Sequence, residues 1–452
     1  MLVSSIFLLI ISIPARAAPV EPRSLVFMIS DGFGQTSEAL ARAYMQLMDA
    51  HWTSPLDPHL VGSTRTKSTS LVTDSAAGAT AFACTQKTYN GAIAVDANGR
   101  PCVTIMEAAH RKGYLTGLVT TARITHATPA AFAAHVADRD MEDLIAEQLV
   151  NSSAVDLLMG GGRCHFVPHD QEGSCRNDST NLLTNKYNMQ SNLNITGLPT
   201  MALFANNHMS YEIDRTDQPS LSEMTRSALS ALAQTNRAFF VMIEGARIDM
   251  AGHDNDPATH LHEILEYWRT VEVVKKFVDQ NPHTLLVSTS DHETGGLTLG
   301  IDPEYIWHPG FLAKVTRSAE TICQKLKRHQ EDDMEDSVGE AIKKHLGIHD
   351  ASESEIDGIV KAVKDAKVCK RAVGNVVSRR AHIGWSTGGH TGADVGLYAY
   401  GRESSRFHGS MENTEVGREL ANYLSLDLSK LTINMPVVSK RTMFAHTYID
   451  HN

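Results

Sequence analysis

The sequence predicts an α/β protein built on a mainly parallel β-sheet. Short apolar, β-branched runs alternate along the chain with stretches whose apolar residues recur at helical spacing, and this alternation is typical of strand–helix–strand units. The chain has 452 residues, enough for one large domain or two ordinary ones. The predicted strands are residues 24–30, 114–121, 155–160, 238–245, 283–290 and 395–401.

The clearest predicted helix covers residues 261–278, where apolar positions repeat at helical spacing. From residue 303 to 383 the pattern changes to charged amphipathic helices, one of which opens with a capping box from Ser352 to Glu355. We interpret residues 303–383 as an inserted lid or small helical subdomain. Its charges are expected to form a solvated face.

Composition and charge exclude several classes of protein. Hydrophobic residues make up 42% of the chain and charged residues 21%, which is typical of a globular rather than a disordered protein. The net charge of −11 and the lack of long Lys/Arg runs argue against nucleic-acid binding. The 22 histidines point to metal or proton chemistry without locating it.

The N-terminus has the features of a secretory signal peptide over residues 1–17. Its apolar stretch is too short to span a bilayer and ends in Ala15-Arg16-Ala17, a small-x-small cleavage pattern. We expect cleavage after Ala17 and a secreted protein without stable membrane insertion; an uncleaved N-terminal anchor and a vacuolar location are the alternatives. The C-terminal tail lacks a hydrophobic stretch, so a GPI anchor is not expected.

Six cysteines in an exported chain predict disulfides, although their connectivity cannot be read from sequence. Cys84 lies one helix length after Ser75 and is either free or paired with Cys102. The other candidate pairs are Cys164 with Cys175, which would close a short loop, and Cys323 with Cys369, which bracket part of the predicted insert. Three sequons for N-glycosylation, which suit export, begin at Asn151, Asn177 and Asn194.

Acidic residues and histidines follow three of the predicted strands. Because open α/β sheets bind ligands at the carboxyl ends of their strands, we expect these side chains to converge. Buried carboxylates are costly unless cations neutralise them, and mixed His/Asp sets suit zinc whereas all-oxygen sets suit magnesium. The residues are Asp31 after strand 24–30, Glu244, Asp249 and His253 after residues 238–243, and Asp291 and His292 after strand 283–290.

The stretch LVTDSAAGAT, residues 71–80, begins a predicted helix made almost wholly of small residues. Small residues let a helix approach a sheet or a ligand closely. The Asp74-Ser75 pair at its start places a hydroxyl where backbone N–H groups and the helix dipole favour an anion. Taken alone, this pair is more often a simple N-cap than a nucleophile awaiting a phosphate.

Two further features are interpreted as structural. The Gly-rich stretch MGGGRCHF, residues 159–166, lacks the ending of a nucleotide-binding loop and is expected to be a backbone turn after a strand. His135 lies on a small-residue helix and is expected to be a hydrogen-bonded core histidine rather than a metal ligand.

Taken together, the motifs resemble those of the alkaline phosphatase family. VTDSAAGAT is similar to the family's nucleophile signature, with Ser75 in the nucleophile position. The other motifs are ISDGFG around Asp31, THATPAAFAAHVADR (residues 125–139), IEGARIDMAGH (residues 243–253), SDHETGG (residues 290–296) and GGHTGADVGLYAYG around His390. They follow the family order and span nearly the whole mature chain. The resemblance implies a three-layer sandwich with helices on both faces of the sheet, a catalytic domain over residues 18–452 and an inserted crown at 303–383.

The resemblance also implies hydrolysis of small phosphomonoesters at alkaline pH, through a phosphoserine on Ser75, by a homodimeric enzyme with two zinc ions and one magnesium ion. Arg139 would bind two non-bridging phosphate oxygens with its guanidinium group. The implied ligand sets are Asp249, His253 and His390 for one zinc, Asp31, Asp291 and His292 for the second, and Asp31, Thr128 and Glu244 for magnesium.

Two positions depart from the family pattern. Next to Asp249, bacterial relatives tend to carry Lys and animal relatives His, but this chain has Met250, for which a packing role is the simpler interpretation. His126 stands where the bacterial pattern has Asp and the animal pattern His. Both departures bear on turnover and on the magnesium preference of the third metal site.

Two other functions compete with this interpretation. The first is another metallohydrolase of the same superfamily, a nucleotide phosphodiesterase or a sulfatase, but the sulfatase motif C/S-x-P-x-R does not occur around Ser75. The second is a non-catalytic zinc- or phosphate-binding protein. A preference for bis-esters would favour the first alternative, and metal uptake without turnover the second.

Overall fold

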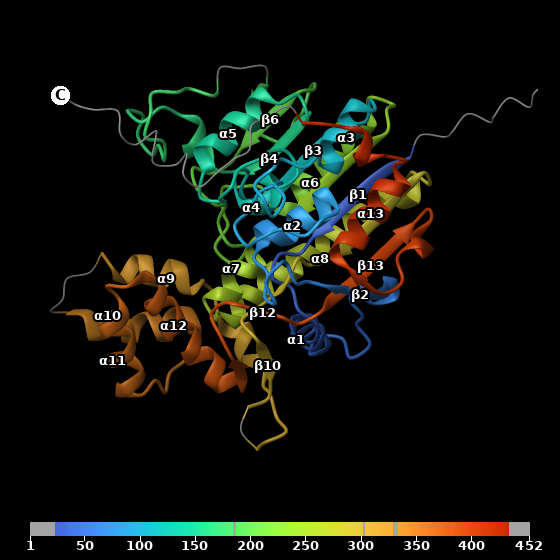
Figure 1. The fold of residues 1–452 in the computed structure, drawn as a ribbon. Helices are drawn as coiled ribbons and strands as arrows, with labels where there is room; N and C mark the ends of the chain where they lie inside the picture. Colours follow the sequence, from blue (N-terminus) through green and yellow to red (C-terminus); the bar gives the residue numbers. More distant parts are fainter. Residues whose placement is uncertain (1–22, 184–186, 302, 329–332, 434–452) are drawn as a thin grey trace, which may run out of the picture.

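Ten strands form one central sheet in the computed structural model, which describes residues 23–183, 187–301, 303–328 and 333–433 (Figure 1). Within the described part of this sheet, β13 alone runs antiparallel to its neighbours. In order across the sheet, the strands are β14 (Gly409–Glu412), β2 (Leu60–Arg65), β13 (Val395–Gly401), β8 (Thr284–Thr289), β1 (Ser24–Ile29), β7 (Phe239–Glu244), β3 (Leu115–Arg123), β4 (Leu157–Gly161), β6 (Thr200–Leu203) and β5 (Asn188–Gln190). The predicted fold class is confirmed, and the six predicted strands correspond to β1, β3, β4, β7, β8 and β13.

Side chains of each central strand alternate between two apolar cores, one on each face of the sheet. In β1, Leu25, Phe27 and Ile29 enter one core, and Val26 and Met28 enter the other, because successive strand residues point to opposite faces. One face is covered by α2 (Ser75–Cys84), α3 (Ile105–Arg111), α5 (Glu142–Asn151) and α13 (Asn413–Tyr423). The other is covered by α1 (Gln35–Gln46), α6 (Leu221–Ala233) and α8 (Pro257–Gln280), which contains the predicted helix 261–278. The result is the expected three-layer sandwich.

Helix α2 is buried along its whole length, and its small residues explain how it fits against the sheet. Asp74 caps the helix by accepting a hydrogen bond from the backbone N–H of Ala77. A Cβ at Gly78 would lie 3.1 Å from Cβ of Asp291, which follows β8. The helix therefore approaches the end of β8 as closely as a glycine allows.

A group of helices from the chain segment between β10 (Leu297–Leu299) and β11 (Ile383–Trp385) gathers beside the sheet (Figure 1). The predicted capping box from Ser352 to Glu355 is confirmed. The helices are α9 (Ala319–Leu326), α10 (Met334–Ala341), α11 (Glu353–Ala362) and α12 (Ala366–Ala381). Their apolar faces continue the core that lies under α8. The lid or crown role of residues 303–383 stays a prediction.

The remaining elements are short. Two helices at the end of the sheet are α4 (Ala127–Ala130) and α7 (Arg247–His253), and β12 (His390–Thr391) pairs with β9 (Glu293–Thr294). Among the described residues, 3₁₀ helices cover Asp57–His59, Arg163–Phe166, Pro309–Lys314, Ser404–Arg406 and Leu428–Lys430, and a π-helical turn covers Ile342–Leu346.

All six cysteines form disulfides, and Cys84 pairs with Cys102 rather than remaining free. The other two pairs are Cys164–Cys175 and Cys323–Cys369. The asparagines of the three sequons are exposed, and their glycosylation stays a prediction. The expected signal peptide and the C-terminal tail lie outside the described residues. Among the helices that are described, none has the length and apolar character required to cross a membrane.

Candidate active site

Three adjacent strands deliver acidic side chains to one edge of the sheet. The strand order β8-β1-β7 places their carboxyl ends side by side. Asp31 follows β1, Glu244 is the last residue of β7, and Asp291 and His292 follow β8. All four side chains are inaccessible to solvent. The acidic residues and the histidine that follow these strands therefore lie together, as the sequence predicts.

A second set of candidate ligands lies next to these residues. Asp249 and His253 are one helical turn apart on α7, and their side chains meet, with Asp249 Oδ2 3.3 Å from His253 Nε2. His390 comes from far along the chain because β12 pairs with β9, directly after His292. Its Nε2 lies 3.4 Å from Asp249 Oδ1 and 3.1 Å from His253 Nε2. The Asp249, His253 and His390 set has the composition of a zinc site.

The protein fixes the orientation of each of these histidine rings through Nδ1. His253 Nδ1 donates to the carbonyl of Gly388 at 2.9 Å, and His390 Nδ1 donates to the carbonyl of Thr73 at 2.8 Å. In His292, Nδ1 lies 3.2 Å from the hydroxyl of Thr294. Each ring therefore turns Nε2 towards the cluster. This is the arrangement in which metal-binding histidines are usually held.

The donor atoms of this region fit cations. His253 and His390 each donate from Nδ1 to a carbonyl, so in their neutral forms the lone pairs of their Nε2 atoms face each other across 3.1 Å. Neither oxygen of buried Asp31 makes a hydrogen bond to any described residue, and the same holds for Thr128 Oγ1 and Glu244 Oε1. Buried polar atoms are rarely left without a partner. Bound cations would satisfy all of them.

Ser75 lies beside one of the candidate ligands, His292. Its side chain is 1% exposed, and its Oγ lies 3.2 Å from His292 Nε2. The same Nε2 lies 3.4 Å from Asp31 Oδ1 and 3.3 Å from Asp291 Oδ2. Asp31 and His292, of the second predicted zinc set, also lie in one group with Asp249, of the first set. The two predicted zinc sets are therefore adjacent.

Asp31 also belongs to a third group, together with Glu244 and His126. Thr120 donates a 2.5 Å hydrogen bond to Glu244 Oε2, which leaves Oε1 for another partner. Thr128 lies on α4, two residues after His126, and is fully buried. The sequence did not place His126 among the ligands; the structure adds its nitrogen to the predicted oxygen set.

The electrostatics of the acids reflect their crowding. Burial, reinforced by neighbouring carboxylates, raises the pKa of Asp31 well above its ordinary value and that of Asp291 to about 6. Burial raises the pKa of Glu244 to about 7. For Asp249, burial acts in the same sense, but His253 and His390 outweigh it and hold the pKa well below the ordinary value. Such perturbed groups are typical of functional sites.

Arg139 lies at the rim of the group and is held from two sides. Its Nη1 donates to Asp74 Oδ2 at 3.2 Å, and its Nη2 donates to His126 Nε2 at 3.0 Å. Sequence reasoning treated Asp74 only as a helix cap and missed this second contact. It also missed Thr294, whose hydroxyl donates to Asp249 Oδ1 at 2.5 Å. Met250 is half-buried on α7, and its role stays a prediction.

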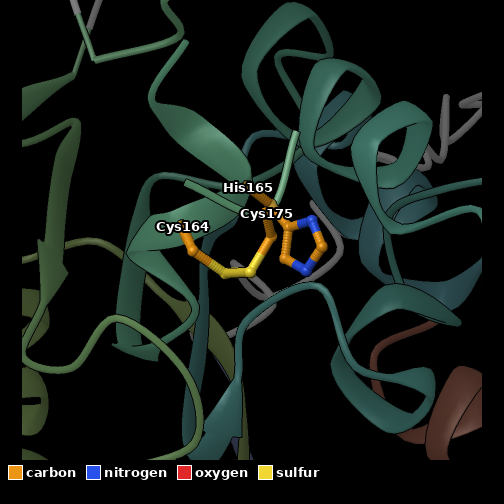
Figure 2. Close-up of side chains that lie close together, drawn as sticks. All are labelled: Cys164, His165 and Cys175. Carbon is orange, nitrogen blue, oxygen red and sulfur yellow. A yellow bond between two sulfur atoms is a disulfide. The ribbon is translucent and has the colours of Figure 1, made fainter. Parts of the chain in front are cut away.

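A further cluster of metal-ligand residue types is not a metal site in this structure. Cys164, His165 and Cys175 lie together, but Figure 2 shows the two sulfur atoms joined in a disulfide. The Gly-rich stretch that precedes Cys164 completes β4, and the chain then turns at Gly162, whose φ is +90°. His135 makes hydrogen-bond contacts through both ring nitrogens, with the carbonyl of Ala94 and with Glu107, as expected of a core histidine.

Comparison with known proteins gives a consistent result. Residues 22–426 match the family described as alkaline phosphatase. The chain is 42% identical over 442 residues to an alkaline phosphatase of Schizosaccharomyces pombe, with 91% of this chain and 83% of that protein covered. It is 40% identical over 478 residues to the repressible alkaline phosphatase of Saccharomyces cerevisiae, with 93% and 84% covered.

The fold comparison agrees with the sequence comparison. The crystal structure of a cold-active alkaline phosphatase from the psychrophile Shewanella sp. matches with a TM-score of 0.79 and 33% identity. The match covers 89% of this chain and 99% of that one. The likeness therefore extends over most of the fold.

Proposed function

Because this chain belongs to the alkaline phosphatase family, we propose that it is a metal-dependent enzyme that hydrolyses phosphate monoesters at alkaline pH through a phosphoserine on Ser75. The observation that carries the proposal is the position of Ser75. Its buried Oγ lies 3.2 Å from Nε2 of His292, which belongs to one of the groups of candidate metal ligands. A serine in that position can act as a nucleophile without a separate histidine base.

We assign two zinc ions and one magnesium ion to these groups. The assignment rests on donor chemistry, because mixed nitrogen and carboxylate donors suit zinc and oxygen donors suit magnesium. His126 adds a nitrogen beside the magnesium set, which bears on the metal preference there. The proposed ligand sets are Asp249, His253 and His390 for one zinc, Asp31, Asp291 and His292 for the second, and Asp31, Thr128 and Glu244 for magnesium.

In the proposed reaction, Ser75 Oγ loses its proton and attacks the phosphorus of the ester. The bond from phosphorus to the alcohol oxygen breaks, the alcohol leaves with a proton that replaces the one Ser75 released, and the phosphoryl group remains on Ser75. A water molecule then attacks the same phosphorus, the bond to Oγ breaks and Oγ regains a proton, so that inorganic phosphate is released. The first turn of α2 lies next to the charge that develops on Oγ, because Ser75 is its first residue.

Arg139 is proposed to bind two non-bridging oxygens of the phosphoryl group, with Asp74 and His126 holding its guanidinium in place. When bound, the zinc and magnesium ions would supply Lewis acidity that lowers the pKa of the Ser75 hydroxyl and of the attacking water. Because these groups ionise further as pH rises, an alkaline optimum is expected. The carboxylates of Asp31, Asp291 and Glu244 would balance the positive charge of these ions.

Several finer properties complete the proposal. The substrates are small phosphomonoesters rather than nucleic acids, in keeping with the negative net charge of the chain. The protein is exported, which three disulfides support, and residues 1–17 are removed. The active form is a homodimer, as the family resemblance implies.

The proposal is tested by hydrolysis of an aryl phosphomonoester at alkaline pH, measured after chelation and again after zinc and magnesium are restored. We expect activity to be lost on chelation and to return only with the metals. An aryl bis-ester serves as the comparison substrate, and its preferential hydrolysis would overturn the monoesterase assignment. Zinc uptake without turnover of either ester would instead indicate a binding protein.

A further inference from the structure

Helix α12 of the inserted segment lies against the end of α7, the helix that carries Asp249 and His253. A Cβ at Gly374 of α12 would lie 2.5 Å from the carbonyl oxygen of Asn255, so the two backbones approach as closely as glycine allows. One residue pair adds charge to this contact, since Lys370 Nζ lies 2.8 Å from Asp254 Oδ1. The insert therefore contacts the chain directly beside a candidate metal ligand.

Arg371 extends from α12 to both segments that present the histidines of the first zinc set. Its Nε donates to the carbonyl of His253 at 3.2 Å, and its Nη2 donates to the carbonyl of Gly388 at 3.1 Å. Gly388 precedes His390 by two residues. A Cβ at Gly388 would lie 1.6 Å from Arg371 Nη2, so the glycine leaves the space that the guanidinium occupies.

The carbonyl of Gly388 connects Arg371 to the ring of His253. It accepts from Arg371 Nη2 and also from His253 Nδ1, at 2.9 Å, so both of its lone pairs are used. One guanidinium thus links the main chain at His253 to the main chain before His390. Asn255 makes a parallel link, because its Nδ2 donates at 3.0 Å to the carbonyl of Gly252 and to that of Thr387.

We propose that Arg371 is a positioning residue that holds His253 and His390 in the relative orientation in which they share one cation, which makes the insert a part of the metal site. The inference rests on the proposed function, since the cation is the zinc ion assigned to Asp249, His253 and His390. Arg371 itself touches none of these ring nitrogens. Cys369, two residues before Arg371, is buried and bonded to Cys323 of α9, so the helix that carries Arg371 is anchored covalently in the insert.

The experiment compares zinc binding by the full chain and by Arg371→Ala, Arg371→Lys and Arg379→Ala. Arg379 is an exposed arginine of the same helix and provides the matched control. Each protein is stripped of metal and titrated with zinc against a coloured chelator, and the thermal midpoint is measured with and without zinc. Loss of a group that orients a metal ligand commonly weakens metal binding by about 10- to 100-fold.

For Arg371→Ala we expect one of the two zinc equivalents to bind about 10- to 100-fold more weakly, with a smaller thermal shift on zinc addition and an unchanged midpoint of the metal-free protein. Arg371→Lys, which keeps the charge but has one donor nitrogen, should be intermediate. If Arg371→Ala does not fold, Arg371→Lys provides the test. Weaker zinc binding than in the unaltered protein would support the inference, and equal binding would overturn it. Titration curves of Arg371→Ala and Arg379→Ala that coincide would overturn the inference. Absence of zinc binding by the unaltered protein would instead overturn the proposed function itself.

Discussion

Asp74 holds both the helix that begins with Ser75 and the guanidinium of Arg139. One carboxylate oxygen accepts from the backbone N–H of Ala77 at 3.0 Å, and the other accepts from Arg139 Nη1 at 3.2 Å and from the backbone N–H of Gly91 at 2.9 Å. The proposed nucleophile and the proposed phosphate-binding group are therefore positioned by one side chain.

The substitution Asp74→Asn tests this relationship. An amide oxygen can still cap α2, but the charge that holds Arg139 is lost. We expect KM and the inhibition constant of inorganic phosphate to rise about tenfold, which corresponds to about 1.4 kcal/mol. Steady-state kinetics check the result. The control is Asp140→Asn, an exposed acid beside Arg139, and equal constants in the two variants would contradict a role for Asp74.

The substitution Ser75→Ala tests the proposed nucleophile. Removing the hydroxyl should lower kcat by at least about 10³-fold, because no other group is proposed to accept the phosphoryl group. Zinc content should remain that of the unaltered protein, since the proposed ligand sets are complete without Oγ. Metal analysis and turnover are measured on the same sample. Ser70→Ala changes an exposed serine of the preceding loop and should leave both values unchanged; appreciable turnover by Ser75→Ala would require a different nucleophile.

Helix α2 should tolerate no side chain at Gly78. Gly→Ala in an open helix interior stabilises a protein by up to about 1 kcal/mol, and this is expected at Gly358 of α11, where a Cβ would have nothing within 4 Å. At Gly78 the new Cβ would press on Asp291 at 3.1 Å. We expect Gly78→Ala to lower kcat/KM and zinc affinity and Gly78→Val to lower them further. A gain of stability with full activity in Gly78→Ala would show that Asp291 can move aside.

Glu263 gives a prediction about pH. It is buried on α8, where it accepts a 2.6 Å hydrogen bond from the backbone N–H of Glu212. Burial raises its pKa from 4.5 to about 7, so the folded protein binds a proton that the unfolded chain releases at lower pH. The stability that this proton contributes is fully present below pH 4.5 and is lost as pH rises through 7.

The substitution Glu263→Gln keeps the acceptor oxygen and removes the ionisation. The variant should therefore be more stable than the unaltered protein by a larger margin at pH 8 than at pH 5. The two margins should differ by an unfolding free energy on the order of 2 kcal/mol. Thermal denaturation at the two pH values measures it. Glu272→Gln, at an exposed position of the same helix, serves as the control and should show no such dependence on pH.

The six strands predicted from the sequence belong to the central sheet, and the missed strands of that sheet are short or incompletely buried; β6 is fully buried but has only four residues. The central strands are buried on both faces and therefore consist of nearly continuous apolar residues, which a sequence pattern reveals. Strand β2, with the sequence LVGSTR, is largely half-buried, and β5 has only three residues. Neither contains enough apolar residues to produce a pattern, and both are strands because their neighbours supply hydrogen-bond partners.

The candidate site was predictable to a similar degree. Asp31 and Asp291 could be anticipated because the residues at the ends of parallel strands meet at one edge. The second role of Asp74, the hydrogen bond of Thr294 and the reach of Arg371 depend on distances between segments that are remote in sequence. The pairing of Cys84 with Cys102 likewise needed the fold, since six cysteines allow fifteen pairings.

The position of β1 in the sheet has a consequence for how the protein matures. The register places Ser24 opposite Thr284 and Leu25 opposite Phe240, so the first strand of the chain acquires its partners only after most of the chain has been synthesised. Such long-range pairing slows folding, because a large loop must close before the contacts form. The proposed cation ligands are therefore expected to lie apart in the nascent chain, and the capacity to bind metal is expected only once folding is nearly complete.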